Sequence, residues 1–180
     1  MRYKRQEILF VDGYNMIGAW PELTQLKKMD QLNQARDQLL FELSEYRKYR
    51  DLKIIVVFDA QFVPGITQIY EHYQVEVVFT QEGETADSYI EREVAHWISP
   101  LNRVVVATSD MAEQWLIFQK GAMRMSANEL YMQLQFNKRQ VRQTVEDHYS
   151  QLIRRRSPWK LDQLKLLDDL RFRLDDDKNE

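Results

Sequence analysis

Short runs of apolar residues alternate along this chain with longer stretches in which apolar residues recur every three or four positions. The short runs have the length and the flanking turn residues of β-strands. The run at 53–58 is almost continuously apolar, which is typical of a parallel strand covered on both faces. We predict strands at Ile8–Val11, Lys53–Phe58, Val75–Phe79 and Arg103–Ala107, and a short fifth strand at Ala122–Met125.

The longer stretches carry the apolar spacing and the boundary residues of helices. The first follows a break at Trp20-Pro21, and we expect Asp30 to cap it. Thr85 is expected to cap the second, and Ser126 with Glu129 has the spacing of a capping box that opens a long helix. Helices are expected at about 30–50, 85–98, 108–121, from 126 onward, and at 161–174.

Strands that alternate with helices predict an α/β fold with a central, mainly parallel sheet and right-handed crossovers. The 180 residues suffice for one domain with a buried core and a tail. The composition changes after about Asn137, because the segment 138–160 holds seven Lys and Arg residues against two acidic ones. We therefore predict a domain over residues 1–136 and a basic, helical C-terminal extension over 137–180 that packs on or near it.

The overall composition narrows the possible chemistry. Cysteine is absent, which excludes disulfides, thiolate catalysis and cysteine zinc sites. The net charge is −3, so attraction to nucleic acid must come from a local basic surface. No apolar stretch is long enough for a signal peptide or a membrane span, so we expect a cytoplasmic protein without a membrane partner.

Four aspartates lie where a predicted strand ends or a predicted helix begins. Asp12, Asp59 and Asp110 follow the first, second and fourth strands, and Asp87 lies in the first turn of the helix after the third. Because the carboxyl ends of parallel strands share one edge of a sheet, we expect these side chains to face one crevice. Carboxylates that crowd together need a proton or a cation between them, and Mg²⁺ prefers such oxygen ligands. The pattern predicts a divalent metal site and metal-dependent phosphodiester chemistry.

Neighbouring residues fit the same interpretation. Asn15 can orient a phosphate or a water, and Thr108 and Ser109 offer hydroxyls beside a predicted helix N-terminus. Each acid taken singly also has a structural explanation, because Asp is an ordinary helix cap and is favoured in a first helical turn. The four acids together at one sheet edge favour a metal site.

Other α/β chemistries lack their motifs. Neither a Gly-x-Gly-x-x-Gly sequence nor a Gly-Lys-Ser/Thr loop occurs, which disfavours Rossmann and P-loop nucleotide binding. A dehalogenase-like phosphatase would need an aspartate two residues after Asp12, where Tyr14 stands. The three histidines do not have the spacing of a metal motif.

Basic residues form a second candidate surface, for RNA. Those of the C-terminal segment would contact phosphates, although a solvated helix face explains them equally well. Lys120 and Arg124 lie near Gly121 and are further candidates to reach RNA. The residues predicted to bind RNA are Thr108, Ser109, Lys120, Arg124, Lys138, Arg139, Arg142, Arg154, Arg155 and Arg156.

Several motifs follow one another in an order that resembles a known family. Val-Asp-Gly-Tyr-Asn-Met-Ile-Gly at 11–18 is similar to the opening motif of the NYN domain, a branch of the PIN-like nuclease superfamily. Val-Val-Phe-Asp-Ala at 56–60, Glu-Thr-Ala-Asp at 84–87, Ala-Thr-Ser-Asp at 107–110 and Ser-Ala-Asn-Glu-Leu at 126–130 follow. Together they resemble the YacP-like NYN family of bacteria, closely over about 8–135 and more loosely in the basic tail.

This resemblance implies a three-layer α/β/α PIN-like sandwich and an endoribonuclease that depends on Mg²⁺ or Mn²⁺. It further implies cleavage of mRNA in association with the ribosome, so RNA and the ribosome are the expected partners and DNA is not. The implied acidic pocket consists of Asp12, Asp59, Asp87 and Asp110, with Asn15 beside it. Two alternatives stay open: a non-catalytic RNA- or ribosome-binding module, and a small metal-dependent phosphohydrolase.

Overall fold

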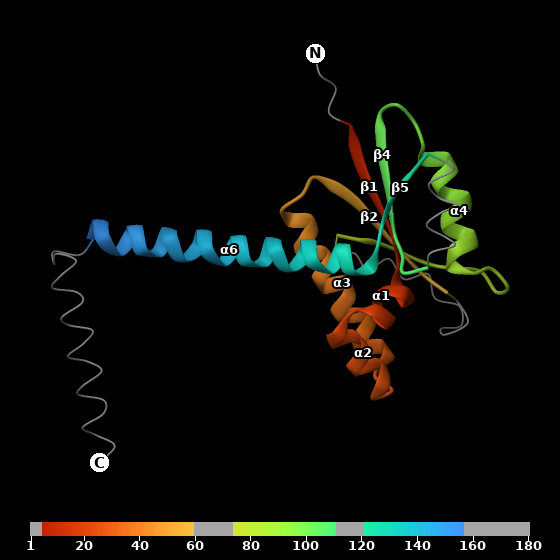
Figure 1. Cartoon of the computed structure of the whole chain (residues 1–180), viewed down its shortest axis with the longest axis horizontal. Helices are drawn as coiled ribbons and strands as arrows, with labels where there is room; N and C mark the ends of the chain where they lie inside the picture. Colours follow the sequence, from red (N-terminus) through yellow and green to blue (C-terminus); the bar gives the residue numbers. More distant parts are fainter. Residues whose placement is uncertain (1–4, 60–73, 111–120, 157–180) are drawn as a thin grey trace. The chain divides into compact units, whose positions relative to one another are not determined.

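A computed structural model describes residues 5–59, 74–110 and 121–156, with side chains up to residue 145 (Figure 1). Its strands form one five-stranded parallel sheet in the order β3-β2-β1-β4-β5, which confirms the predicted α/β class. The described elements are β1 (Gln6–Asp12), α1 (Gly13–Ala19), α2 (Pro21–Lys28), α3 (Leu32–Lys48), β2 (Leu52–Phe58), β3 (Glu76–Phe79), α4 (Ala86–Trp97), β4 (Asn102–Ala107), β5 (Met123–Met125) and α6 (Ala127–Arg156).

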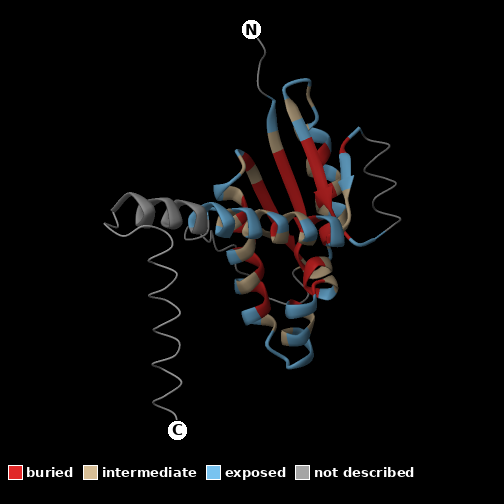
Figure 2. Cartoon of the chain, turned by 60° about the vertical axis from the view of Figure 1, so that its left-hand side comes forward, coloured by how far each residue is buried: buried red, intermediate tan, exposed pale blue. Residues whose placement is uncertain are grey.

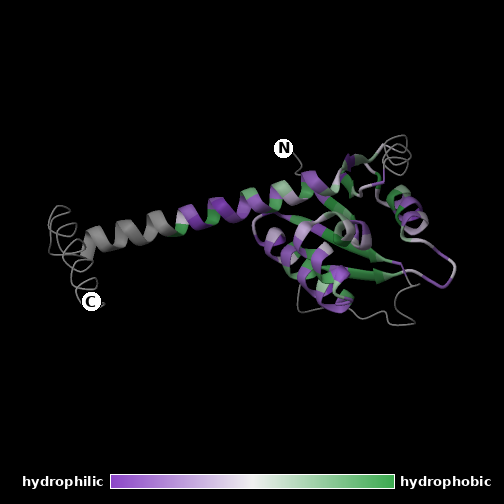
Figure 3. Cartoon of the chain, turned by 60° about the horizontal axis from the view of Figure 1, so that its bottom comes forward, coloured by the Kyte–Doolittle hydropathy of each residue, from purple (hydrophilic) through white to green (hydrophobic). Residues whose placement is uncertain are grey.

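The sheet buries alternate side chains on its two faces, as the period of two in a strand requires. In β1, Leu9 and Val11 join a core with α1, α2, α3 and the start of α6, whereas Ile8 and Phe10 join a second core with α4. The buried strands lie between helices (Figure 2), and their central residues are strongly hydrophobic (Figure 3). The predicted three-layer arrangement is therefore confirmed.

The strand register brings the ends of the central strands to one level. Asp12, the last residue of β1, pairs with Val57, and Asp59 lies only two residues further along, directly after the end of β2. On the other side, Val11 pairs with Ala107, the last residue of β4. The chain segments that follow β1, β2 and β4 therefore leave the sheet at the same edge.

The segment between β1 and β2 departs from the sequence prediction. Two short helices surround the expected break at Trp20-Pro21, and Pro21 stands in the first turn of α2, where its missing N–H costs no hydrogen bond. The prediction that Asp30 caps the following helix is wrong. Asp30 has a φ of 60° in the turn, and α3 begins at Leu32 without a side-chain cap.

Two predicted caps are confirmed. The Thr85 hydroxyl accepts a hydrogen bond from the Ser88 backbone N–H at 3.2 Å and thereby caps α4. At the start of α6, the Glu129 carboxylate accepts from the Ser126 N–H at 2.6 Å, and the Ser126 hydroxyl accepts from the Glu129 N–H at 3.2 Å. This reciprocal pair is a capping box, which satisfies two donors at the helix end.

The chain divides into two compact units, Met1–Asn137 and Lys138–Glu180, and α6 contributes residues to each. The body of the helix predicted at 108–121 and the helix predicted at 161–174 lie outside the described residues. Within the part of the chain that the structure describes, no helix combines the length and the apolar character needed to cross a membrane.

A candidate acidic active site

A pocket of about 560 Å³ lies at the carboxyl edge of the sheet, where ligands bind in open α/β folds. Three of the four predicted aspartates line it: Asp12 from the end of β1, Asp59 after β2 and Asp87 in the first turn of α4. We call it the acidic pocket; its lining consists of Asp12, Tyr14, Asn15, Gly18, Ala19, Lys27, Asp59, Thr85, Ala86, Asp87 and Ser109.

Asp12 is the most buried acid of the pocket, with 4% of its surface exposed. Its carboxylate caps α1 by accepting the Asn15 backbone N–H at 3.0 Å, and its other oxygen accepts the Asn15 side-chain amide at 2.6 Å. Asp12 therefore does cap a helix, which is the structural explanation that the sequence left open for it. A carboxylate offers about four acceptor positions, so these two bonds orient Asp12 and still leave it able to bind a cation.

A close contact between α1 and β2 links the positions of Asp12 and Asp59. Gly13 follows Asp12, and a Cβ atom built on it would lie 2.2 Å from Cε1 of Phe58, the residue before Asp59. The Phe58 ring is fully buried, with the Tyr14 ring edge-on at 5.1 Å and the Phe79 ring stacked at 5.5 Å between centroids. Only glycine allows this approach, so the packing sets the spacing of the two acids.

The sequence analysis missed a contact between Tyr14, which lines the acidic pocket, and Arg36 of α3. The Tyr14 hydroxyl accepts a hydrogen bond from Nη1 of Arg36 at 3.1 Å, and the buried Arg36 guanidinium also donates to Asn33. Burial raises the pKa of Tyr14, Arg36 opposes that shift, and the negative charge of Asp59 adds to it. Tyr14 therefore presents a neutral phenol to the acidic pocket. The one sign of this contact in the sequence was the position of Arg36, a charged residue next to the apolar stripe of α3.

The fourth motif, Thr108-Ser109-Asp110, is arranged differently from the prediction. Ser109 lines the acidic pocket, whereas Asp110 is not among the described residues that line it. The fully buried Thr108 hydroxyl accepts the Asp110 backbone N–H at 3.1 Å, so its position does not favour the predicted contact with RNA. Lys27, an exposed residue in the last turn of α2, lines the pocket and was not predicted.

The carboxylates of the pocket fit a Mg²⁺ or Mn²⁺ ion that keeps part of its water shell. Mg²⁺ is usually held by one or two carboxylates together with waters and substrate phosphates. Within the described residues, no three Asp, Glu or His side chains are gathered closely enough to hold an ion by themselves. Asp12, Asp59 and Asp87 therefore match an open, hydrated ion better than a closed site made only of protein ligands.

The residues predicted to bind RNA are scattered over several elements. Arg124 is exposed on β5, and Arg139 and Arg142 are exposed on the part of α6 that belongs to the second unit, where Lys138 is half-buried. Lys120 lies outside the described residues. Arg154, Arg155 and Arg156 are the last residues of α6, beyond residue 145, where the described side chains end.

Comparison with known proteins identifies the family of this chain. A family model described as "YacP-like NYN domain" matches residues 9–172. The chain belongs to the YacP-like NYN family. It is 45% identical over 139 residues to "Uncharacterized protein YacP" of Bacillus subtilis (strain 168), which covers 77% of this chain and 81% of that protein. The family resemblance found in the sequence is thus confirmed.

Two crystal structures of Rae1 (YacP) from Bacillus subtilis share this fold. One superposes with a TM-score of 0.70 at 40% identity and covers 91% of this chain and 94% of that one. A mutant form gives a TM-score of 0.69 at 42% identity, covering 81% and 85% of the two chains. Membership of the YacP-like NYN family is consistent with a nuclease-type fold.

Proposed function

We propose that this protein is a metal-dependent endoribonuclease that cleaves mRNA in association with translating ribosomes. One observation carries the proposal: Asp12, Asp59 and Asp87 line a single pocket with Asn15, at the carboxyl edge of a parallel sheet. Carboxylates concentrated in this way suit a divalent cation and a phosphodiester, and the nuclease-type family supports the same chemistry.

Hydrolysis of a phosphodiester forms a bond from a water oxygen to phosphorus and breaks the bond from phosphorus to the leaving oxygen. The water gives up a proton, and the leaving oxygen gains one. A divalent ion held by one or two of the carboxylates Asp12, Asp59 and Asp87, with waters and the phosphate as its other ligands, would supply positive charge that offsets the charge growing on the phosphoryl oxygens. The Asn15 amide keeps the Asp12 carboxylate in one orientation. Lys27, at the rim, adds positive charge for the RNA backbone.

The charge of the chain supports a role for the ribosome. At a net charge of −3 the protein has little general attraction for RNA, and its proposed site is itself acidic. Association with a ribosome would raise the local concentration of mRNA at the pocket without any tight intrinsic affinity. The basic residues of the second unit, including Arg139 and Arg142, are compatible with such an association.

The test is cleavage of a defined mRNA with and without translating ribosomes, in Mg²⁺ or Mn²⁺, by the wild type, Asp12→Asn and Asp37→Asn. Asp37 is exposed on α3 and serves as the matched control, because its substitution makes the same chemical change at a residue that does not line the acidic pocket. We expect cleavage by the wild type and Asp37→Asn, dependent on ribosomes, and none by Asp12→Asn or after chelation.

Each other outcome changes a definite part of the proposal. Cleavage of naked mRNA at the same rate would remove the ribosome from the mechanism. Full activity of Asp12→Asn, or full activity of the wild type in excess chelator, would show that the acidic pocket does not carry the cleavage. Binding of RNA or ribosomes without cleavage in any arm would favour the non-catalytic module, and turnover of a simple phosphomonoester would favour the phosphohydrolase.

A further inference from the structure

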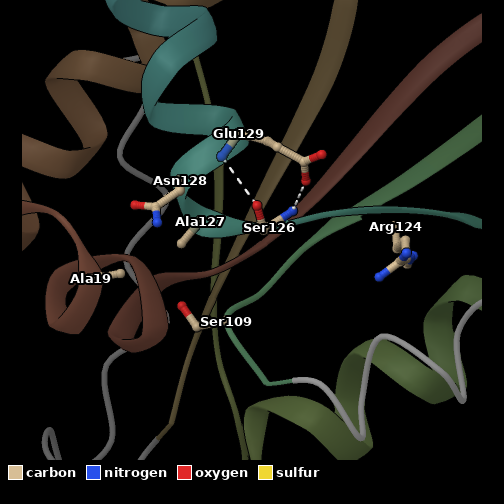
Figure 4. A pocket seen from close by; sticks show the side chains of 7 residues that line it. All are labelled: Ala19, Ser109, Arg124, Ser126, Ala127, Asn128 and Glu129. Carbon is tan, nitrogen blue, oxygen red and sulfur yellow. Dashed lines mark hydrogen bonds between the residues drawn. The ribbon is translucent and has the colours of Figure 1, made fainter.

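A second pocket, of about 490 Å³, adjoins the acidic pocket (Figure 4). The two share Ala19 and Ser109 as lining residues, so Ser109 stands at the boundary between them. The remaining walls come from β5 and the start of α6. The second pocket is lined by Ala19, Ser109, Arg124, Ser126, Ala127, Asn128 and Glu129.

The chemistry of this second pocket differs from that of the acidic pocket. Its single carboxylate, Glu129, already accepts the Ser126 N–H in the capping box, a bond that lowers the pKa of Glu129 with a further contribution from nearby Arg124. Figure 4 shows Asn128 on one side and Arg124 on the other, with Ser109 and Ser126 between them. The pocket thus offers a guanidinium, an amide and hydroxyls instead of three carboxylates.

These groups match the parts of a nucleotide. A guanidinium binds phosphate through charge-assisted, often paired hydrogen bonds. Serine hydroxyls and an asparagine amide can each donate and accept, which suits a ribose hydroxyl or the edge of an unpaired base. The volume is within the range of about 300–1,000 Å³ that is usual for small-molecule sites. The capping box already uses hydrogen-bonding groups at the N-terminus of α6. The match to a nucleotide therefore depends on the side chains of the second pocket and on its continuity with the acidic pocket.

We propose that the second pocket binds the nucleotide of single-stranded RNA that adjoins the phosphodiester placed in the acidic pocket. Arg124 contacts the phosphate of that nucleotide, and Asn128 contacts its ribose or base. Ser109 lies at the boundary that the chain crosses between the two pockets. This inference rests on the proposed function, because it takes RNA as the substrate of the acidic pocket.

The test uses the full chain with Asp12→Asn, so that RNA is bound without being cut, and a series of single-stranded oligoribonucleotides that grow by one nucleotide. Arg124→Gln and Asn128→Ala are compared in this background with Arg103→Gln. Arg103 is exposed near the start of β4, toward the opposite edge of the sheet, and makes a matched control for loss of charge. Equal unfolding free energies of the variants establish that each is folded.

We expect affinity to rise when the oligonucleotide becomes long enough to enter both pockets. Arg124→Gln should lower the affinity about tenfold for oligonucleotides of that length or longer, since a hydrogen bond to a charged group is lost. For shorter oligonucleotides the affinity should change little. Asn128→Ala should act at the same length, and Arg103→Gln should leave the length dependence intact.

The inference and the proposed function fail in different ways. Equal effects of Arg124→Gln and Arg103→Gln at every length, or no binding of single-stranded RNA, would overturn the nucleotide pocket even if the wild type cleaves mRNA. Conversely, a wild type that cleaves nothing, with the length-dependent loss preserved, would overturn the nuclease and keep the pocket as an RNA-binding site.

Discussion

Substitution of Gly13 by alanine tests how the α1–β2 contact sets the acidic pocket. The added methyl group would lie 2.2, 2.5 and 2.8 Å from three ring atoms of Phe58. Contacts this short do not persist in folded proteins, so either the ring or the helix must move. The ring has little room, because Phe58 is fully buried between Tyr14 and Phe79.

Two opposing effects determine the size of the change. Overpacking a buried site costs about 1–3 kcal/mol. Replacing glycine with alanine inside a helix gains at most about 1 kcal/mol, and less in the first turn, where Gly13 stands. We therefore expect Gly13→Ala to destabilise the fold by about 1–2 kcal/mol or more. Because Asp12 and Asp59 flank the contact, activity should also fall at temperatures where the variant is still folded.

The assay is urea unfolding at equilibrium, with two further variants for comparison. Gly18→Ala lies in the same helix, and a Cβ there would meet nothing within 4 Å, so it should be neutral or stabilising by up to about 1 kcal/mol. Phe58→Leu removes the ring that causes the clash. In that background, Gly13→Ala should cost much less than in the wild type, and the coupling between the two substitutions measures the contact.

The reasoning would be refuted if Gly13→Ala were as stable as the wild type. It would also fail if the cost were unchanged in the Phe58→Leu background, because the loss would then arise from the helix backbone and not from the ring. If Gly18→Ala destabilised the fold as much as Gly13→Ala does, the cost would likewise belong to the helix and not to the contact with Phe58.

Much of this fold was predictable because the strands are strongly apolar and the caps are local. The runs around Phe10, Val57 and Val105 have the composition of buried parallel strands, and Thr85 and Ser126 cap helices through residues only three positions away. The meeting of Asp12 and Asp59 at one edge followed from the parallel register, and Asp87 joins them from the first turn of α4, which Thr85 caps.

The features that escaped prediction depend on packing between segments far apart in the chain. Arg36 meets Tyr14 across 22 positions, and nothing local to either residue signals that contact. Lys27 reaches the acidic pocket because α2 packs against α1 and α3, and helices of seven and eight residues are too short to show a clear apolar period. Asp110 was predicted at the crevice because it follows the fourth strand by two residues, but it is not among the described residues that line the acidic pocket, and its backbone N–H is bonded to Thr108 in the turn after β4.

Three further predictions concern the ion, stability in acid and the contact between Tyr14 and Arg36. Mg²⁺ or Mn²⁺ should raise the melting temperature of the wild type and not that of Asp12→Asn, because a ligand that binds the folded state stabilises it; equal shifts would count against the site. Glu129 has a pKa below its ordinary value, chiefly through the Ser126 N–H, so it stabilises the fold above about pH 4 and loses this as the pH falls through its folded pKa. Glu129→Gln should therefore be less stable than the wild type at neutral pH and equally stable in acid, as measured by urea unfolding. Tyr14→Phe should cost about 1–3 kcal/mol, because the buried Arg36 loses an acceptor; an unchanged unfolding free energy would refute that role.

Asp12 serves two purposes, and a pair of substitutions separates them. As the N-cap of α1 it accepts the Asn15 backbone N–H, and asparagine caps a helix about as well as aspartate does. Asp12→Asn should therefore keep most of the stability while removing the negative charge, whereas Asp12→Ala should lose the cap as well, at a cost of about 0.5–2 kcal/mol. Unfolding free energies and cleavage rates measured on both variants give a decisive comparison. If Asp12 acts through its charge, the two variants are equally inactive although their stabilities differ. If activity instead followed stability, with Asp12→Asn nearly as active as the wild type, Asp12 would be a structural cap and the chemistry would belong to other residues.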